Sequence, residues 1–178
     1  MISSSAPVLS RRAVPASRTS KARCILFKRQ PIFWNLDGVS FVKQIRVMHP
    51  NVIEPEPQSW SNCKKVGDHV YIAGMVALIG DKQLAGIGDT YTQARVIFGH
   101  IKNLMEAAGG CIDDVVRLVI YITDIEQRYE VWRARREYFH GHYPTCALVE
   151  VSALFVPEIL VEIEAIGIIG SADLSADA

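Results

Sequence analysis

AAGGCIDDVVRLVIYITD, residues 107–124, is the most informative segment of the chain, because it joins the end of one predicted helix to a strand and to the start of a second helix. Gly109 and Gly110 can take the left-handed conformation that closes a helix. The run VVRLVIYI is almost entirely apolar, which predicts a strand buried on both faces. Asp124 then stands where an N-cap residue begins the next helix.

The helix before this stretch is predicted to begin near Asp89 or Thr90. Its apolar residues recur at spacings of three and four, so that they share one face. They are Ala94, Ile97, Ile101, Leu104, Met105 and Ala108. This helix is therefore predicted to lie on the sheet with that face inward.

The helix after Asp124 is predicted to turn four large residues inward, namely Ile125, Tyr129, Trp132 and Phe139. We expect its run of charges, which includes Arg128 and Arg135, to face solvent mostly. Such a solvated charged face is the ordinary arrangement for a helix that packs on a core.

Strands are predicted on both sides of the helices. CKKVGDHVYIAG has the pattern of a hairpin with Gly67 and Asp68 at its turn, and Gly80 with Asp81 marks a second turn. HYPTCALVEV and LVEIEAIGII give two more apolar strands near the end of the chain. The element order predicts a single domain of the α+β class with two helices on a mixed sheet.

Two helices can cover only one face of this sheet. The strands are nevertheless apolar on both sides, and six of their residues cannot all point at the helices: Val119, Tyr121, Val149, Val151, Val161 and Ile163. A bare apolar face of several hundred Å² is rarely left in water. We therefore expect another subunit to cover it.

The charge is divided unevenly along the chain. Residues 1–36 contain seven Lys or Arg and no acid, whereas residues 48–178 contain 10 Lys or Arg and 18 Asp or Glu, a net charge of −8. An acidic domain is unsuited to neutralising phosphates, so we expect no nucleic-acid partner. No apolar run is long enough for a membrane span, and four widely spaced cysteines favour free thiols in a reducing compartment.

Three segments are predicted: a disordered basic extension over residues 1–47, one domain over 48–170 and a disordered tail over 171–178. The extension has two interpretations. It can be an upstream sequence without function before a natural start at Met48, which favours a cytoplasmic protein. Alternatively, the acid-free, Arg- and Ser-rich residues 1–36 can be a transit peptide, which favours a mitochondrial one.

With these elements in place, the chain resembles the RidA (YjgF/UK114) family. The similar blocks are VGDHVYIAG, AAGGCIDDVVRLVIYITD, YPTCALVEVSAL and LVEIEAIG, within about residues 60–169. The resemblance implies a chorismate-mutase-like fold that assembles as a homotrimer with three ligand clefts between subunits. It also implies hydrolysis of reactive enamines and imines, such as 2-aminoacrylate, to 2-keto acids and ammonia.

The chain departs from the family's pattern at the residues that carry this chemistry. Cys146 stands where the resemblance expects a carboxylate-binding arginine, and Leu148 stands where a cysteine is frequent. Trp60 replaces a tyrosine, and the triplet Ala73, Gly74, Met75 replaces Ser-Gly-Gln. Of the implied functional residues, the acid Glu162 remains. We expect Glu162 to line the cleft together with the six residues just named: Trp60, Ala73, Gly74, Met75, Cys146 and Leu148. Arg117 is expected to anchor the ligand in place of the missing arginine.

Each candidate has an alternative role. Glu162 and Glu164 share one strand face, and apolar surroundings would suit Glu162 to a proton shuttle; both acids can instead bond backbone amides at a subunit boundary. Cys146 can be a nucleophile if its pKa is lowered, or a small apolar filler. His140, His142 and Cys146 match no familiar zinc spacing, so we expect no metal, and without a nucleotide-binding motif we expect no cofactor.

Two functions follow. The first is hydrolytic deamination of a reactive enamine or imine other than 2-aminoacrylate, because the missing arginine weakens binding of a small imino acid. The alternative is a trimer that binds a small metabolite without converting it. A third activity implied by the resemblance, cleavage of single-stranded RNA, is disfavoured by the acidic domain.

Overall fold

The computed structural model describes residues 42–141 and 143–172. Predictions made for residues 1–41 and 173–178 lie outside this part. The chain runs through β1 (Gln44–Arg46), β2 (Cys63–Val66), β3 (His69–Met75), β4 (Leu78–Ile79), β5 (Gln83–Leu84), α1 (Thr90–Ala108), the 3-10 turn η1 (Ile112–Asp114), β6 (Val115–Ile122), the 3-10 turn η2 (Ile125–Gln127), α2 (Arg128–Arg135), β7 (Thr145–Glu150) and β8 (Val161–Ile168).

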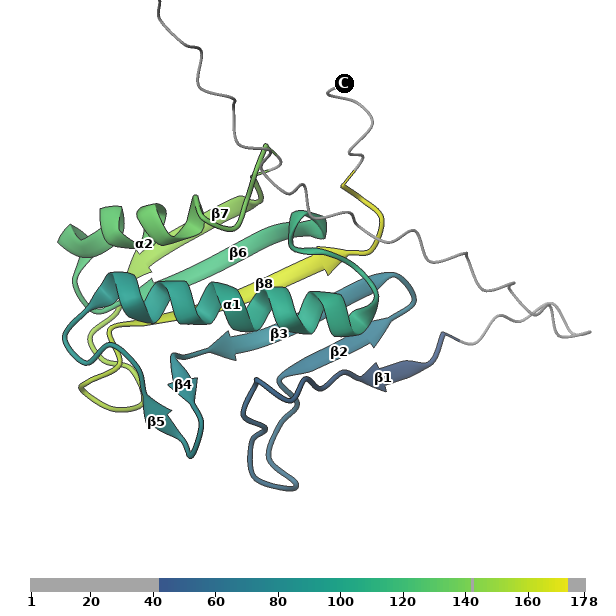
Figure 1. The fold of residues 1–178 in the computed structure, drawn as a ribbon, viewed down its shortest axis with the longest axis horizontal. Helices are drawn as coiled ribbons and strands as arrows, with labels where there is room; N and C mark the ends of the chain where they lie inside the picture. Colours follow the sequence, from purple (N-terminus) through teal and green to yellow (C-terminus); the bar gives the residue numbers. More distant parts are fainter. Residues whose placement is uncertain (1–41, 142, 173–178) are drawn as a thin grey trace, which may run out of the picture.

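Six strands form one mixed sheet in the order β1-β2-β3-β8-β6-β7. The neighbours are antiparallel except β6 and β7, which are parallel and are joined by the crossover through α2. Strands β4 and β5 pair separately, around the predicted turn at Gly80 and Asp81. Both helices lie on the same face of the sheet (Figure 1). The predicted single α+β domain is confirmed.

Helix α1 begins and ends where its local chemistry predicts. The Asp89 side chain accepts a hydrogen bond from the backbone N–H of Thr92, which satisfies one of the free donors of the first turn. At the other end Gly109 has a φ of 95°, a left-handed conformation that costs a residue with a side chain more than it costs glycine. The six apolar residues predicted for its inner face are all buried.

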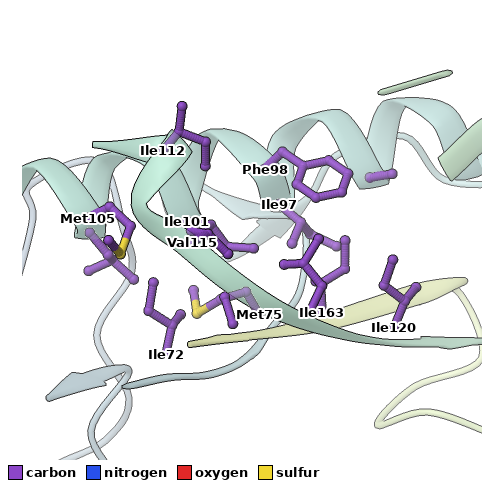
Figure 2. Close-up of a cluster of buried hydrophobic side chains, with 14 of the residues drawn as sticks. Ile72, Met75, Ile97, Phe98, Ile101, Met105, Ile112, Val115, Ile120 and Ile163 are labelled. Carbon is purple, nitrogen blue, oxygen red and sulfur yellow. The ribbon is translucent and has the colours of Figure 1, made fainter. Parts of the chain in front are cut away.

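The core lies between α1 and the sheet (Figure 2). Ile97 and Ile101 of the helix face Ile72, Ile120 and Ile163 of the strands, and all five are at least nine-tenths buried. Strand β8 alternates between buried and half-buried residues along its whole length. One face of β8 therefore belongs to the core, and the other face points away from the helices.

The second helical segment differs from the prediction in its phase. It starts with the 3-10 turn η2, and only residues 128–135 are α-helical. Because a 3-10 turn has fewer residues per turn than an α-helix, the inward positions shift. Val131 and Ala134 are buried, while Tyr129, predicted to face inward, is exposed. Phe139 is buried as predicted, although it lies beyond the end of α2.

Strand β1 lies before Met48, where the sequence predicted the domain to begin. It pairs with β2 in the register Gln44 with Val66 and Arg46 with Lys64. Its three side chains are exposed, so apolar patterning gave no indication of a strand here. Backbone pairing to the edge of the hairpin positions it instead.

The face of the sheet opposite the helices is uncovered in the single chain, as the strand patterns predicted. Tyr71 is 46% exposed and Val149 is 44% exposed, and Val119 and Ile166 on the same face are half-buried. We call this surface the open face. Within the described residues, no helix is both long and apolar enough to cross a membrane.

Candidate functional site

Two acids stand on the open face of β8. Glu162 and Glu164 alternate with the buried Val161, Ile163 and Ala165, as the strand pattern predicted. Burial raises the pKa of the Glu162 carboxyl, and the charge of Glu164 raises it further. The Glu162 carboxyl therefore binds and releases its proton at a pH closer to neutral than an exposed glutamate does.

Gly74 makes the space that Glu162 occupies. The pairing of β3 with β8 shifts register between Ile72 and Met75, so Gly74 lies in an irregular part of the strand. A Cβ atom added to Gly74 would lie 1.8 Å from Oε1 of Glu162. The carboxyl group thus packs directly over the glycine backbone, and a side chain at position 74 would displace it.

Glu164 has a different partner. The Tyr121 hydroxyl on neighbouring β6 donates a hydrogen bond to Oε1 of Glu164, with a donor–acceptor distance of 3.4 Å. Burial raises the pKa of this phenol, and the adjacent Glu164 raises it further. Tyr121 was not predicted as a site residue. The signal that could have found it is the strand register, which pairs Tyr121 with Glu162 across β6 and β8.

A hollow of about 480 Å³ lies on the open face, and of the two acids only Glu164 lines it. It is lined by Ala73, Glu164 and Tyr71, together with the cationic side chains of Arg117 and Lys64. Of the predicted site residues, Ala73 and Arg117 thus reach the same hollow, and Gly74 and Glu162 lie next to each other. Lys64 and Tyr71 pair with each other in the predicted hairpin, but they were missed because the pairing of that hairpin with β8 was not predicted.

The remaining predicted site residues lie elsewhere in the single chain. Met75 is only 5% exposed and packs in the core near Ile72 (Figure 2), because the irregularity in β3 turns it toward the helices. Trp60 lies in the loop before β2 and is 61% exposed. Cys146 and Leu148 pair with Leu118 and Ile120, whose side chains are in the core. They therefore point to the helix side of β7.

Cys146 lies next to Arg135, a cation that was expected to face solvent. Cys146 is exposed as a residue, but its thiol is partly shielded from solvent, which raises the pKa of the thiol; the nearby Arg135 guanidinium opposes this by its charge and by hydrogen bonding. Since the net shift is upward, the thiol is mostly protonated and is a poor nucleophile. Within residues 42–141 and 143–172, no three metal-binding side chains lie close enough together to hold a metal ion. His142, which was considered with His140 and Cys146 as a zinc ligand, lies outside the described residues.

Known proteins are similar to this chain over the region that contains the candidate site. A sequence model of the family described as endoribonuclease L-PSP matches residues 53–169, which contain every element from β2 to β8. A RutC family protein of Pyrococcus horikoshii is 34% identical over 109 residues, which are 60% of this chain and 84% of that protein.

Solved structures are similar over the same region. The crystal structure of PA3499 from Pseudomonas aeruginosa has a TM-score of 0.66 and 34% identity, covering 73% of this chain and 95% of that one. The crystal structure of RidA from an Antarctic Psychrobacter has a TM-score of 0.63 and 30% identity, covering 70% of this chain and 99% of that one.

Proposed function

Since the chain belongs to the endoribonuclease L-PSP family, to which the Rid and YjgF proteins belong, we propose that it hydrolyses a reactive enamine or imine. The observation that supports this most is the carboxyl group of Glu162, half-buried over Gly74 with a raised pKa. A carboxyl in that condition can take a proton from water and return it within one reaction cycle.

The proposed reaction needs only this acid and a bound imine. Water adds to the imine carbon while the Glu162 carboxylate takes one of its protons and passes it to the nitrogen. The second water proton moves to the nitrogen as the C–N bond breaks. Ammonia leaves, and a 2-keto compound remains. Tyr121 and Glu164 stand beside the acid and can hold the water or the nitrogen by hydrogen bonds.

We further propose that the chain acts as a homotrimer with its clefts between copies. Glu162, Ala73 and Gly74 lie on the open face, whereas Cys146 and Leu148 point to the helix side of the edge strand β7. One protomer cannot bring these two groups together. A second copy packed on the open face can place its own edge strand beside Glu162, and it would also remove apolar surface from water.

The substrate is proposed to differ from 2-aminoacrylate. Cys146 supplies no positive charge at the position where the resemblance expects an arginine, and a charge-assisted hydrogen bond is worth about 1.5–3 kcal/mol. Loss of it lowers the affinity for a small imino acid by about tenfold or more. A larger ligand that contacts the apolar wall beside Leu148 is better suited to the cleft.

Glu162→Gln tests this proposal in an assay of ammonia release from a panel of imines generated from different amino acids. Removing a general base is expected to lower the rate about 10²–10⁴-fold. Wild-type activity is expected to fall as the pH drops through the raised pKa of Glu162, because only the ionised carboxylate accepts a proton.

The matched control is Glu106→Gln, which removes an exposed acid of the helix face that is paired with Lys102. This variant should retain wild-type rates. Hydrolysis of no imine above the uncatalysed rate would contradict the enzyme and favour the second candidate, a trimer that binds a metabolite without converting it. Equal rates in Glu162→Gln and wild type would remove Glu162 from the mechanism.

A further inference from the structure

Arg135 differs from the other arginines of its helix in what surrounds it. Arg128 pairs with Glu126 and Arg133 pairs with Glu130, so each has a carboxylate partner. Among the described residues, no carboxylate lies within ion-pair distance of Arg135, and its buried Nε has no hydrogen-bond partner. Its guanidinium instead lies 5.8 Å from the centre of the Tyr143 ring.

A half-buried guanidinium in this condition is costly to leave without an anion. Removing a charge from water lowers its solvation, and an unpaired buried N–H donor adds to the cost. The guanidinium lies next to Cys146 at the outer edge of the sheet, because β7 is the edge strand and α2 lies beside it (Figure 1). Tyr143 and Cys146 are both exposed, so an anion can reach this point from solvent.

We infer that Arg135 is the anion-binding residue of the cleft, and that it holds the carboxylate of a 2-imino or 2-keto acid larger than 2-aminoacrylate, because its guanidinium lies on the helix and not at position 146 of the strand. The inference rests on the proposed function for the identity of the ligand. The positive charge that is absent from position 146 of the strand is then supplied from the helix. A guanidinium can form two parallel hydrogen bonds with a carboxylate, and the Tyr143 ring at 5.8 Å is within range of a cation–π contact with it.

Calorimetric binding of 2-oxobutanoate to the full chain tests the inference without requiring turnover. Arg135→Gln is expected to weaken binding at least about tenfold, the contribution of one charge-assisted hydrogen bond. Binding of the uncharged 2-oxobutanamide should be the same in both proteins. Arg136→Gln is the matched control, because Arg136 is the next residue, is exposed and carries the same charge. A surface change of this kind should alter binding by no more than about twofold.

A relocated charge gives the second arm of the test. The double variant Arg135→Gln with Cys146→Arg places the guanidinium on the strand instead of the helix, and it should recover binding of 2-oxobutanoate. If Arg135→Gln does not fold, Arg135→Lys replaces it, and the loss of the two-pronged geometry should weaken acid binding about tenfold.

Three results would overturn the inference: equal binding by the Arg135 and Arg136 variants, unchanged binding by Arg135→Lys, or a wild-type protein that binds the acid no better than the amide. Failure of the anion site can be distinguished from failure of the proposed enzymatic function. Loss of acid binding in Arg135→Gln without hydrolysis of any imine would support the anion site and contradict the enzyme. Hydrolysis that depends on Glu162 but not on Arg135 would support the enzyme and contradict the anion site.

Discussion

Gly74 and Glu162 occupy one space, which makes the glycine a determinant of where the acid stands. The carboxyl lies where a side chain at position 74 would begin. Because Glu162 is flexible, an added methyl group would displace its carboxyl and leave the surrounding backbone in place. Displacement of a reacting group by about 1 Å can cost about 10²-fold in rate.

Gly74→Ala is therefore expected to lower imine hydrolysis by that order while leaving the thermal midpoint nearly unchanged or slightly higher. Alanine restricts the unfolded chain more than glycine does, which favours the folded state. The measurement is kcat together with thermal unfolding. In the Glu162→Gln background the same substitution should cause no further loss of rate, and an additive loss would show that Gly74 acts through something other than Glu162.

Helix α1 packs its buried face against the sheet and forms one side of the core, so its N-terminal cap affects the stability of the whole fold. Hydrogen bonds from Thr92 lower the pKa of Asp89 from its ordinary value of 3.8. This contribution is present when Asp89 is ionised, above the ordinary pKa, and is lost as the pH falls through the lowered one.

Asp89→Ala is expected to lower the free energy of unfolding by about 1 kcal/mol at neutral pH, measured by urea denaturation. Asp81→Ala is the control, since Asp81 is an exposed turn residue that caps no helix. Equal losses in the two variants would mean that the cap of α1 contributes nothing beyond the removal of an aspartate.

The elements differ in how well the sequence predicted them, and the reason is the range of the interactions that form them. Asp89 and Gly109 set the ends of α1 by local hydrogen bonds and backbone conformation, and both were predicted. The phase of the second helical segment depends on a 3-10 turn that no spacing rule indicated, so Tyr129 was placed wrongly. Met75 faces the core because of an irregularity that arises only when β3 pairs with β8.

In the candidate site, too, features set within one strand were predicted and features set by contacts between elements were not. The alternation of β8 predicted that Glu162 and Glu164 share a face, because that pattern is a property of one strand. Arg135 was expected in solvent, yet it is half-buried beside Cys146. Its partners lie on β7 and in the preceding loop, and the packing of α2 against that edge is a contact between separate elements that periodicity does not encode.

In the proposed homotrimer, packing of copies through the open face would link that face to the site. In one chain Glu162 of β8 and Cys146 of β7 point to opposite sides of the sheet, and the apolar residues of the open face remain in water. Both features are accounted for when copies of the chain pack through this face. A charge placed within it should oppose assembly, because burying an unpaired carboxylate is costly.

The mass of the protein in dilute solution, measured by light scattering during gel filtration, distinguishes the proposed homotrimer from a single chain. We predict about three times the 19.8 kDa of one chain for the wild type, and a lower mass for Val149→Glu, which places a charge on the open face. Ile87→Glu, at a 71% exposed position in the loop before α1 and outside the sheet, should keep the wild-type mass. A wild-type mass of one or two chains, or a Val149→Glu variant as large as the wild type, would contradict the account.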